Sequence, residues 1–320
     1  ILHFRTFRWQ KYNQRKYYCK MKYLKYFLII LCFFSCEKER ELIGGNNAPY
    51  YDEVPTILLE NYVNRLYIDL IGREPLDDEM ERDVLYLKNN DVSFGSRDSL
   101  ILKLQSDTLF IEGDSSYKKA YFHRTYEMLK VRLLEGVSNG VIQQEMGNAY
   151  QRYLSDSLLG NMLEANKSLL QFNMLSTIIS SEHEYMHGNI NINEVHRRMI
   201  YNPIYDQINM NTFNFVNASF DNLLYRYPTQ YEFDEVYSMI ENNTAQIVFG
   251  QSANDKEGFT HIISNTREFY EGVILWSYLT LLARNPSTQE TDFLMQSFYF
   301  DYDLQYVQRE IMKTNEYAHF

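Results

Sequence analysis

The chain has 320 residues and a formal net charge of −11. An acidic surface repels the phosphates of nucleic acids and of anionic lipid headgroups, so the composition argues against a nucleic-acid partner. The three cysteines are Cys19, Cys32 and Cys36. Residues 37–320 therefore have no thiol for a disulfide, for a cysteine-ligated metal or for attachment of c-type haem.

The composition of residues 1–20 is not that of a folded domain. The stretch begins with Ile1, carries six basic residues and has no acidic residue. A signal peptide follows it directly, and signal peptides start close to their charged region, so we expect Met21 to be the true start and residues 1–20 to be upstream translation.

Residues 21–36 have the layout of a bacterial lipoprotein signal peptide. Two lysines near the start precede an apolar run over 26–34, and the stretch ends in Ser35 and Cys36. Crossing a bilayer needs about 20 apolar residues, whereas this shorter run suits the hydrophobic region of a signal peptide. We therefore expect residues 21–35 to be removed and Cys36 to carry lipid. That lipid would anchor the protein in the outer membrane, facing the periplasm or the cell surface.

Removal of the leader makes the net charge of the mature protein more negative than that of the full sequence. Residues 1–36 hold eight basic residues and no acidic one, so the mature net charge becomes −19 instead of −11. This larger negative charge strengthens the case against nucleic acid.

Residues 36–53 are expected to form a tether, because they are charged and then rich in glycine and asparagine. The first part, Glu-Lys-Glu-Arg-Glu over residues 37–41, resembles the charged stretch that helps to direct Bacteroidetes lipoproteins to the cell surface. The aromatic and asparagine-rich composition is similar to that of the same group of proteins. An ordinary solvated tether is the alternative.

From residue 54 onward, apolar side chains recur at intervals of three and four, the pattern of amphipathic helices. We predict a mainly α protein of about ten helices in an irregular multi-helix array, with an N-terminal lobe over 54–165 and a C-terminal lobe over 166–320. One short strand is predicted over 247–249, followed by a polar loop over 250–258. The predicted helical segments are 57–70, 78–89, 97–106, 114–134, 140–159, 161–180, 208–226, 230–242, 261–284, 288–299 and 302–314.

A pattern of the form Arg-x-Pro-x-x-x-Glu occurs three times, starting at Arg73, Arg226 and Arg284. Proline disfavours helical geometry in the residue before it, so each pattern predicts the end of one helix and a corner into the next. An arginine in the last turn of a helix is expected to bond the free carbonyl groups there.

The residue after each proline is expected to cap the second helix of the corner. Thr229 and Ser287 stand at this position, and the glutamate three residues later completes a capping box. In the first copy Leu76 occupies the position, so Asp77 is expected to cap instead. These features predict helix–turn–helix corners with a structural role.

The first corner resembles a known signature. Residues 67–75 with Glu79 are similar to the Asp-Leu-x-Gly-Arg-x-Pro-x-x-x-Glu signature of an uncharacterised helical domain of planctomycete surface proteins, which often stands beside c-type cytochrome modules. The stretches 220–232 and 276–290 resemble later corners in such proteins. The resemblance implies a helical fold and no established activity, and the haem-binding module is missing from this chain.

One motif points to catalysis. His183, Glu184 and His187 match His-Glu-x-x-His, in which the two histidines share a helix face and can bind one Zn²⁺ while the glutamate activates the bound water. A third ligand would come from downstream, with candidates His196, Glu194 and the Glu232/Glu235 pair. The alternative is a pair of solvent-exposed histidines at a helix C-terminus, favoured by the helix dipole.

Two functions are therefore expected. The first is a lipid-anchored cell-envelope protein with an interaction or assembly role, without an expected cofactor, whose partner is another envelope protein or a glycan. The second is a zinc metallopeptidase that uses His183, Glu184 and His187. The membrane itself would be contacted through lipidated Cys36.

Overall fold

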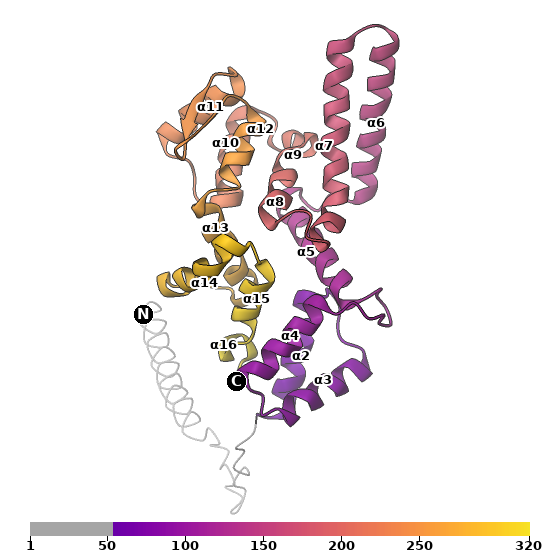
Figure 1. Cartoon of the computed structure of the whole chain (residues 1–320), viewed down its shortest axis with the longest axis vertical. Coiled ribbons are helices and arrows are strands. Elements are labelled where there is room, and N and C mark those ends of the chain that lie inside the picture. The colour runs from indigo at the N-terminus through magenta and orange to yellow at the C-terminus, as the bar shows by residue number, and fades with distance from the viewer. Residues whose placement is uncertain (1–53) are drawn as a thin grey trace, which may run out of the picture. The chain divides into compact units, whose positions relative to one another are not determined.

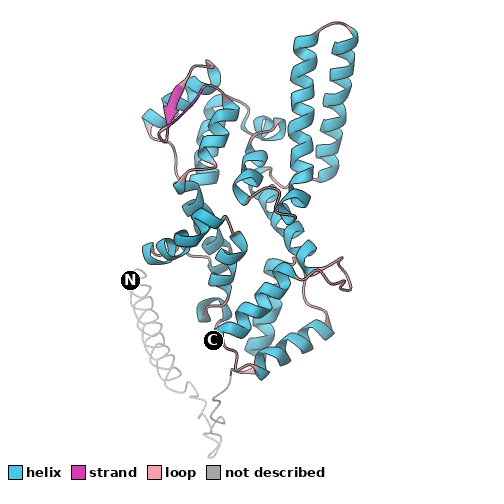
Figure 2. Ribbon diagram, viewed as in Figure 1, coloured by secondary structure: helices cyan, strands magenta, loops and turns pink. Residues whose placement is uncertain are grey.

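Fifteen helices and one pair of short strands make up residues 54–320, the part of the chain that the computed structural model describes (Figure 1). The predicted mainly α class is confirmed, and Figure 2 shows how little of this region is strand. The predicted leader, tether and lipidated Cys36 lie outside the described residues.

The helices of the first half are α2 (Thr56–Leu70), α3 (Asp77–Asn89), α4 (Phe94–Ser106), α5 (Tyr117–Leu133), α6 (Asn139–Leu158), α7 (Met162–Met186), α8 (Ile192–Ile200) and α9 (Pro203–Asn209). The second half holds α10 (Thr212–Leu224), α11 (Gln230–Glu241), β1 (Gln246–Val248), β2 (Gln251–Ala253), α12 (Lys256–Ile263), α13 (Arg267–Leu282), α14 (Thr288–Asp301), α15 (Leu304–Met312) and α16 (Asn315–Ala318).

Hydroxyl and amide side chains start many of these helices by accepting hydrogen bonds from backbone N–H groups of the first turn. Thr266 is the instructive case, because its hydroxyl accepts from the N–H of Phe269 at 3.0 Å and starts α13. The predicted single helix over 261–284 is therefore wrong. The chain leaves α12 after Ile263 and begins a new helix at Arg267.

The two strands form an antiparallel hairpin in which Ile247 pairs with Ser252. The predicted strand at 247–249 is thus found one residue earlier. The predicted loop over 250–258 is wrong in part, since β2 and the first turn of α12 both fall within it. Its polar side chains suit an exposed strand pair, which a search for apolar alternation misses.

Apart from Ala149 and Ala165, the buried apolar side chains of the described residues form one continuous cluster. The first and last helices of the described residues meet, because α16 packs against α2 and the Tyr317 hydroxyl donates to Asp69 at 2.7 Å. The Tyr62 hydroxyl of α2 also donates to the carbonyl of Met312, the last residue of α15, at 3.2 Å. Helix α7 runs through the predicted lobe boundary between residues 165 and 166, so the two lobes share a continuous helix there.

No helix among residues 54–320 combines the length and the apolar character that a bilayer crossing requires.

Candidate functional site

Each Arg-x-Pro-x-x-x-Glu corner is closed by a two-pronged ion pair between its arginine and its glutamate. In the first corner, Arg73 donates from Nη1 and Nη2 to the two carboxylate oxygens of Glu79, at 2.7 and 2.9 Å. Nη1 also donates to the carbonyl of Glu74 at 2.9 Å. The residue before the arginine is in the left-handed region in all three corners, with φ of +83° at Gly72, +56° at Tyr225 and +54° at Ala283, and glycine enters this region most readily.

The other two corners repeat the contact. Arg226 donates to Glu232 at 2.8 and 2.7 Å, and Arg284 donates to Glu290 at 3.0 and 2.6 Å. The predicted bonds from these arginines to the last carbonyls of the preceding helix are not what the structure shows. The guanidinium instead turns forward onto the glutamate and the carbonyl of the next residue, because the paired carboxylate matches its fork geometry.

The predicted cap by Asp77 is also wrong. Leu76 holds the N-cap position of α3, and its backbone N–H donates to Glu79 at 2.8 Å. The corner therefore keeps only the glutamate half of a capping box. Thr229 and Ser287, by contrast, form the complete capping box that the sequence predicts.

A second acidic side chain joins each pair from a more distant part of the chain. Arg73 donates to Asp114 at 2.9 Å, Arg226 donates to Glu268, and Arg284 donates to Glu316 at 2.6 Å. Asp114 precedes α5, whereas the other two acids lie in the first turns of α13 and α16. Each corner thus ties the start of a later helix to its own helix pair, and sequence reasoning missed all three acids.

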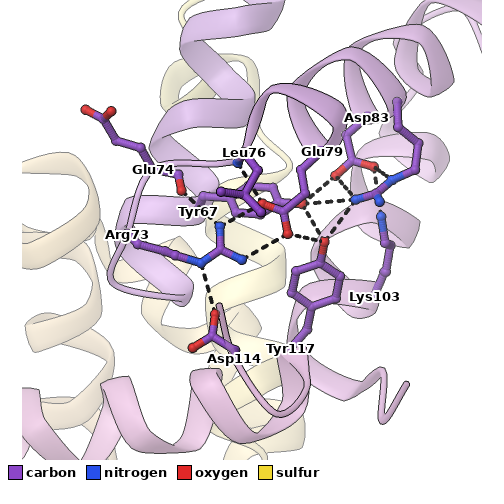
Figure 3. A network of polar contacts seen from close by, with 10 residues as sticks. Tyr67, Arg73, Glu74, Leu76, Glu79, Asp83, Lys103, Asp114 and Tyr117 are labelled. Atoms are coloured by element: carbon purple, nitrogen blue, oxygen red, sulfur yellow. Dashed lines mark hydrogen bonds and ion pairs between the residues drawn. The ribbon is translucent and has the colours of Figure 1, made fainter. Parts of the chain in front are cut away.

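The first corner extends into a buried polar network, drawn in Figure 3. The Tyr117 hydroxyl donates to Glu79 at 2.7 Å and lies 3.0 Å from the Tyr67 hydroxyl, which donates to Asp83 at 2.8 Å. Lys103 donates to Asp83 at 2.8 Å. Each carboxylate here is matched by a cation, so the network holds α2, α3, α4 and α5 together.

Burial and hydrogen bonding hold this network in fixed protonation states. Burial raises the pKa of Tyr117 to about 12 and raises the pKa of Tyr67 further. Burial alone would raise the pKa of Glu79, but the bonds from Arg73, Leu76 and Tyr117 outweigh it and leave that pKa below its usual value. A general acid or base works best with a pKa near the operating pH, so these groups suit structure better than proton transfer.

The His-Glu-x-x-His motif lies at the C-terminal end of α7. The rings of His183 and His187 are both exposed and their centroids lie 4.1 Å apart, which places them on one face of the helix. Nδ1 of His187 bonds the carbonyl of His183 at 2.7 Å. This contact leaves the outer nitrogen of His187 directed away from the helix backbone.

Glu184 is engaged in an ion pair. Arg198 of α8 donates to it at 2.9 Å. A bond from Ser180 and this guanidinium lower the pKa of Glu184, which weakens it as a proton acceptor. No group of three or more histidine, cysteine or acidic side chains converges as metal ligands among the described residues.

Three of the four predicted third ligands, which are Glu194, Glu232 and His196, are engaged elsewhere. Glu194 accepts from Arg197 and Arg198, and Glu232 accepts from Arg226. His196 is buried, where its ring packs edge-on against Phe269. The two motif histidines alone do not complete the three-ligand set that a catalytic zinc needs, and no contact among the described residues favours the peptidase alternative.

An open cavity of about 500 Å³ lies beside the N-terminal end of α5. His123 contacts Glu182 across it at 3.0 Å, and the strongly exposed Phe110 stands at its rim with Asp114 of the first corner. The cavity opens widely to solvent, and its lining combines apolar surface with the charged side chains of Lys119 and Glu182. The cavity is lined by α7 and by the segment 110–123. Because these lie far apart in the sequence, no local sequence pattern could predict it.

A long hairpin of two helices is the other candidate site. Helix α6 packs extensively only against α7, and Figure 1 shows this pair extending beyond the neighbouring helices. Ala149, Ala165 and Ser168 are buried between the two helices, and their small side chains let the helices approach closely. The distal end carries four strongly exposed apolar residues, which are Leu158, Leu159, Met162 and Leu163.

Comparison with protein-family models, with curated proteins and with solved structures finds no match to this chain.

Proposed function

We propose that the protein is a lipid-anchored protein of the outer membrane that binds other macromolecules and has no catalytic role. The observation that carries the proposal is the apolar distal end of the α6–α7 hairpin. Exposing a contiguous apolar surface is unfavourable in water, and such surfaces commonly mark interaction sites. The ion-paired corners support this role, since they hold a helical scaffold rigid beneath the hairpin.

The anchor rests on the signal-peptide pattern that ends at Cys36. Replacement of Cys36 with alanine is expected to release the protein from the membrane fraction and to abolish labelling by a radioactive fatty acid. Cys32→Ala is the matched control, because Cys32 lies in the apolar run and its replacement leaves the acceptor cysteine in place. Continued membrane retention of Cys36→Ala would refute the anchor.

The interaction role has a separate test. Chemical crosslinking of the anchored chain in intact membranes should yield a defined complex. The double variant Leu158→Glu/Met162→Glu should lose it without loss of helicity, because both side chains are exposed. A chain that crosslinks to nothing, a second copy of itself included, would contradict the interaction role.

The crosslinked complex also shows whether the partner is a protein or a glycan. A polypeptide in the crosslinked complex would support an envelope protein, whereas sensitivity of the complex to glycan-cleaving enzymes would support a glycan. The expected net charge of −19 after removal of the leader argues against nucleic acid in either case.

A further inference from the structure

We infer that the distal half of the α6–α7 hairpin, residues 150–171, is a self-association surface that pairs with the same surface of a second copy of this chain. The inference deepens the proposed function and rests on it, because it names the partner. Three observations carry it, namely the area of the exposed apolar surface, its charge and its arrangement.

The exposed apolar area matches what one partner contributes to a stable interface. Seven large apolar side chains of this segment are between 37% and 89% exposed, which are Tyr150, Leu154, Leu158, Leu159, Met162, Leu163 and Leu170. Taking about 200 Å² for a fully exposed large side chain, they present on the order of 800 Å². A standard interface buries about 800 Å² on each partner, and the largest apolar patch of a typical monomer is roughly 300–600 Å².

The charge of the segment permits two identical copies to approach. Residues 150–171 carry two basic and two acidic side chains and are neutral, whereas the whole chain has a net charge of −11. Contact through most other parts of so acidic a surface would bring like charges together. The neutral segment avoids that repulsion.

Four of the exposed side chains belong to apolar stripes that run along the hairpin. Tyr150, Leu154 and Leu158 recur every fourth residue and therefore share one face of α6. On α7, the exposed Met162 shares a face with Leu169 and Phe172, which are half-buried and lie seven and ten residues after it. The ring centroids of Tyr150 and Phe172 lie 5.5 Å apart, which places both stripes on the same side of the hairpin.

A two-fold pairing of such hairpins produces a four-helix bundle, in which each copy covers the apolar stripes of the other. A lipid surface fits this segment less well. Helical segments that lie on membranes are rich in lysine and arginine on their polar face, whereas Lys167 is paired with Glu164 at 2.8 Å and the only other basic residue, Arg152, contacts Gln171.

The test uses two full-length copies with different affinity tags, expressed together and solubilised from the membrane in detergent. Capture of one tag should recover the other, and sedimentation should give the mass of two chains. Leu158→Glu/Met162→Glu should lower recovery at least tenfold, because each interface would then gain four carboxylates in an apolar contact. The matched control is Phe293→Glu/Phe300→Glu, which changes two exposed apolar residues of α14 outside the hairpin and should leave recovery unchanged.

Each other outcome overturns the inference. A wild-type chain that stays monomeric at all concentrations, or a hairpin variant that still recovers the second tag, shows that the segment does not pair. Loss of recovery in both double variants would show a non-specific effect of added charge. Crosslinking to a different molecule through the same residues would leave the proposed function standing and refute only the second copy as partner.

Discussion

Replacement of the three corner glutamates by glutamine should destabilise the fold to different degrees, although the three make the same contact. The side chain of Glu79 is 4% exposed, that of Glu232 is 15% exposed and that of Glu290 is 33% exposed. Glutamine keeps the shape of glutamate and removes the charge. The arginine of each corner then loses its main partner, and the penalty grows as solvent is excluded.

The magnitudes follow from burial. At Glu79 we expect a loss of about 3 kcal/mol, the lower end of the range for breaking a buried pair, because Asp114 still neutralises Arg73. At Glu290 we expect about 1 kcal/mol, since water screens the half-exposed pair. Glu232→Gln should fall between the two, at about 2 kcal/mol.

Urea unfolding of the purified variants, followed by circular dichroism at pH 7, measures these differences. Bonds from Arg226 and Arg284 lower the pKa of Glu232 and Glu290 to about 2. The ion pairs therefore stabilise the fold above the unfolded pKa of about 4.3, and this stability is lost as the pH falls toward 2. The gap between wild type and Glu232→Gln should narrow over that range. A loss at Glu290 equal to that at Glu79 would refute the reasoning from burial.

Two further predictions concern close packing and pH. Gly272→Ala should lower the free energy of unfolding by at least about 2 kcal/mol, because the added methyl group would overlap the carbonyl oxygen of Leu223 where α10 crosses α13. Gly147→Ala, on an open face of α6, should instead raise it by about 0.5–1 kcal/mol, and equal effects in urea melts would contradict the close crossing. Burial lowers the pKa of His196 to about 4, so the folded state favours the neutral ring, and stability should fall by up to about 3 kcal/mol as the pH drops from 6.5 to 4. His196→Gln should flatten this part of the stability profile, and an unchanged slope would assign it to another group.

Several contacts between residues close together in the chain could be predicted from the sequence. The residues that close each corner lie within six positions of one another, so proline, arginine and glutamate at fixed spacing predicted the three turns between helices. The capping boxes at Thr229 and Ser287 were predicted for the same reason. The bond from arginine to glutamate in each corner was not predicted, because the spacing alone does not determine the direction in which the guanidinium points.

The break between α12 and α13 shows the limit of periodicity. Apolar residues recur at helical intervals on both sides of the polar stretch 264–266, so the pattern favoured one helix. The Thr266 hydroxyl started a new helix there because its backbone is extended and it caps the first turn of α13. A single hydroxyl residue within a periodic run is a weak signal, since most such residues do not cap.

In the His-Glu-x-x-His motif, too, the sequence predicted the local relation between residues and not the packing of distant helices. His183 and His187 lie on one helix face as their spacing predicts, because that relation depends only on helical geometry. Whether a third ligand faces them depends on α8, which brings Arg198 to Glu184 instead. Sequence spacing says nothing about which helix packs opposite the motif.

By itself, the sequence determined the helical class and the three corners, because each depends on residues close together in the chain. The lipid at Cys36 stays a prediction of the sequence, made from equally local residues. Only the tertiary structure decided which acids complete the corners, since Arg73 and Asp114 are 41 positions apart. It also decided that the leucines between α6 and α7 remain exposed. A periodic pattern shows which face of a helix a leucine lies on. Whether that leucine is buried depends on whether another element packs against this face. At the distal end of the hairpin none of the described elements does.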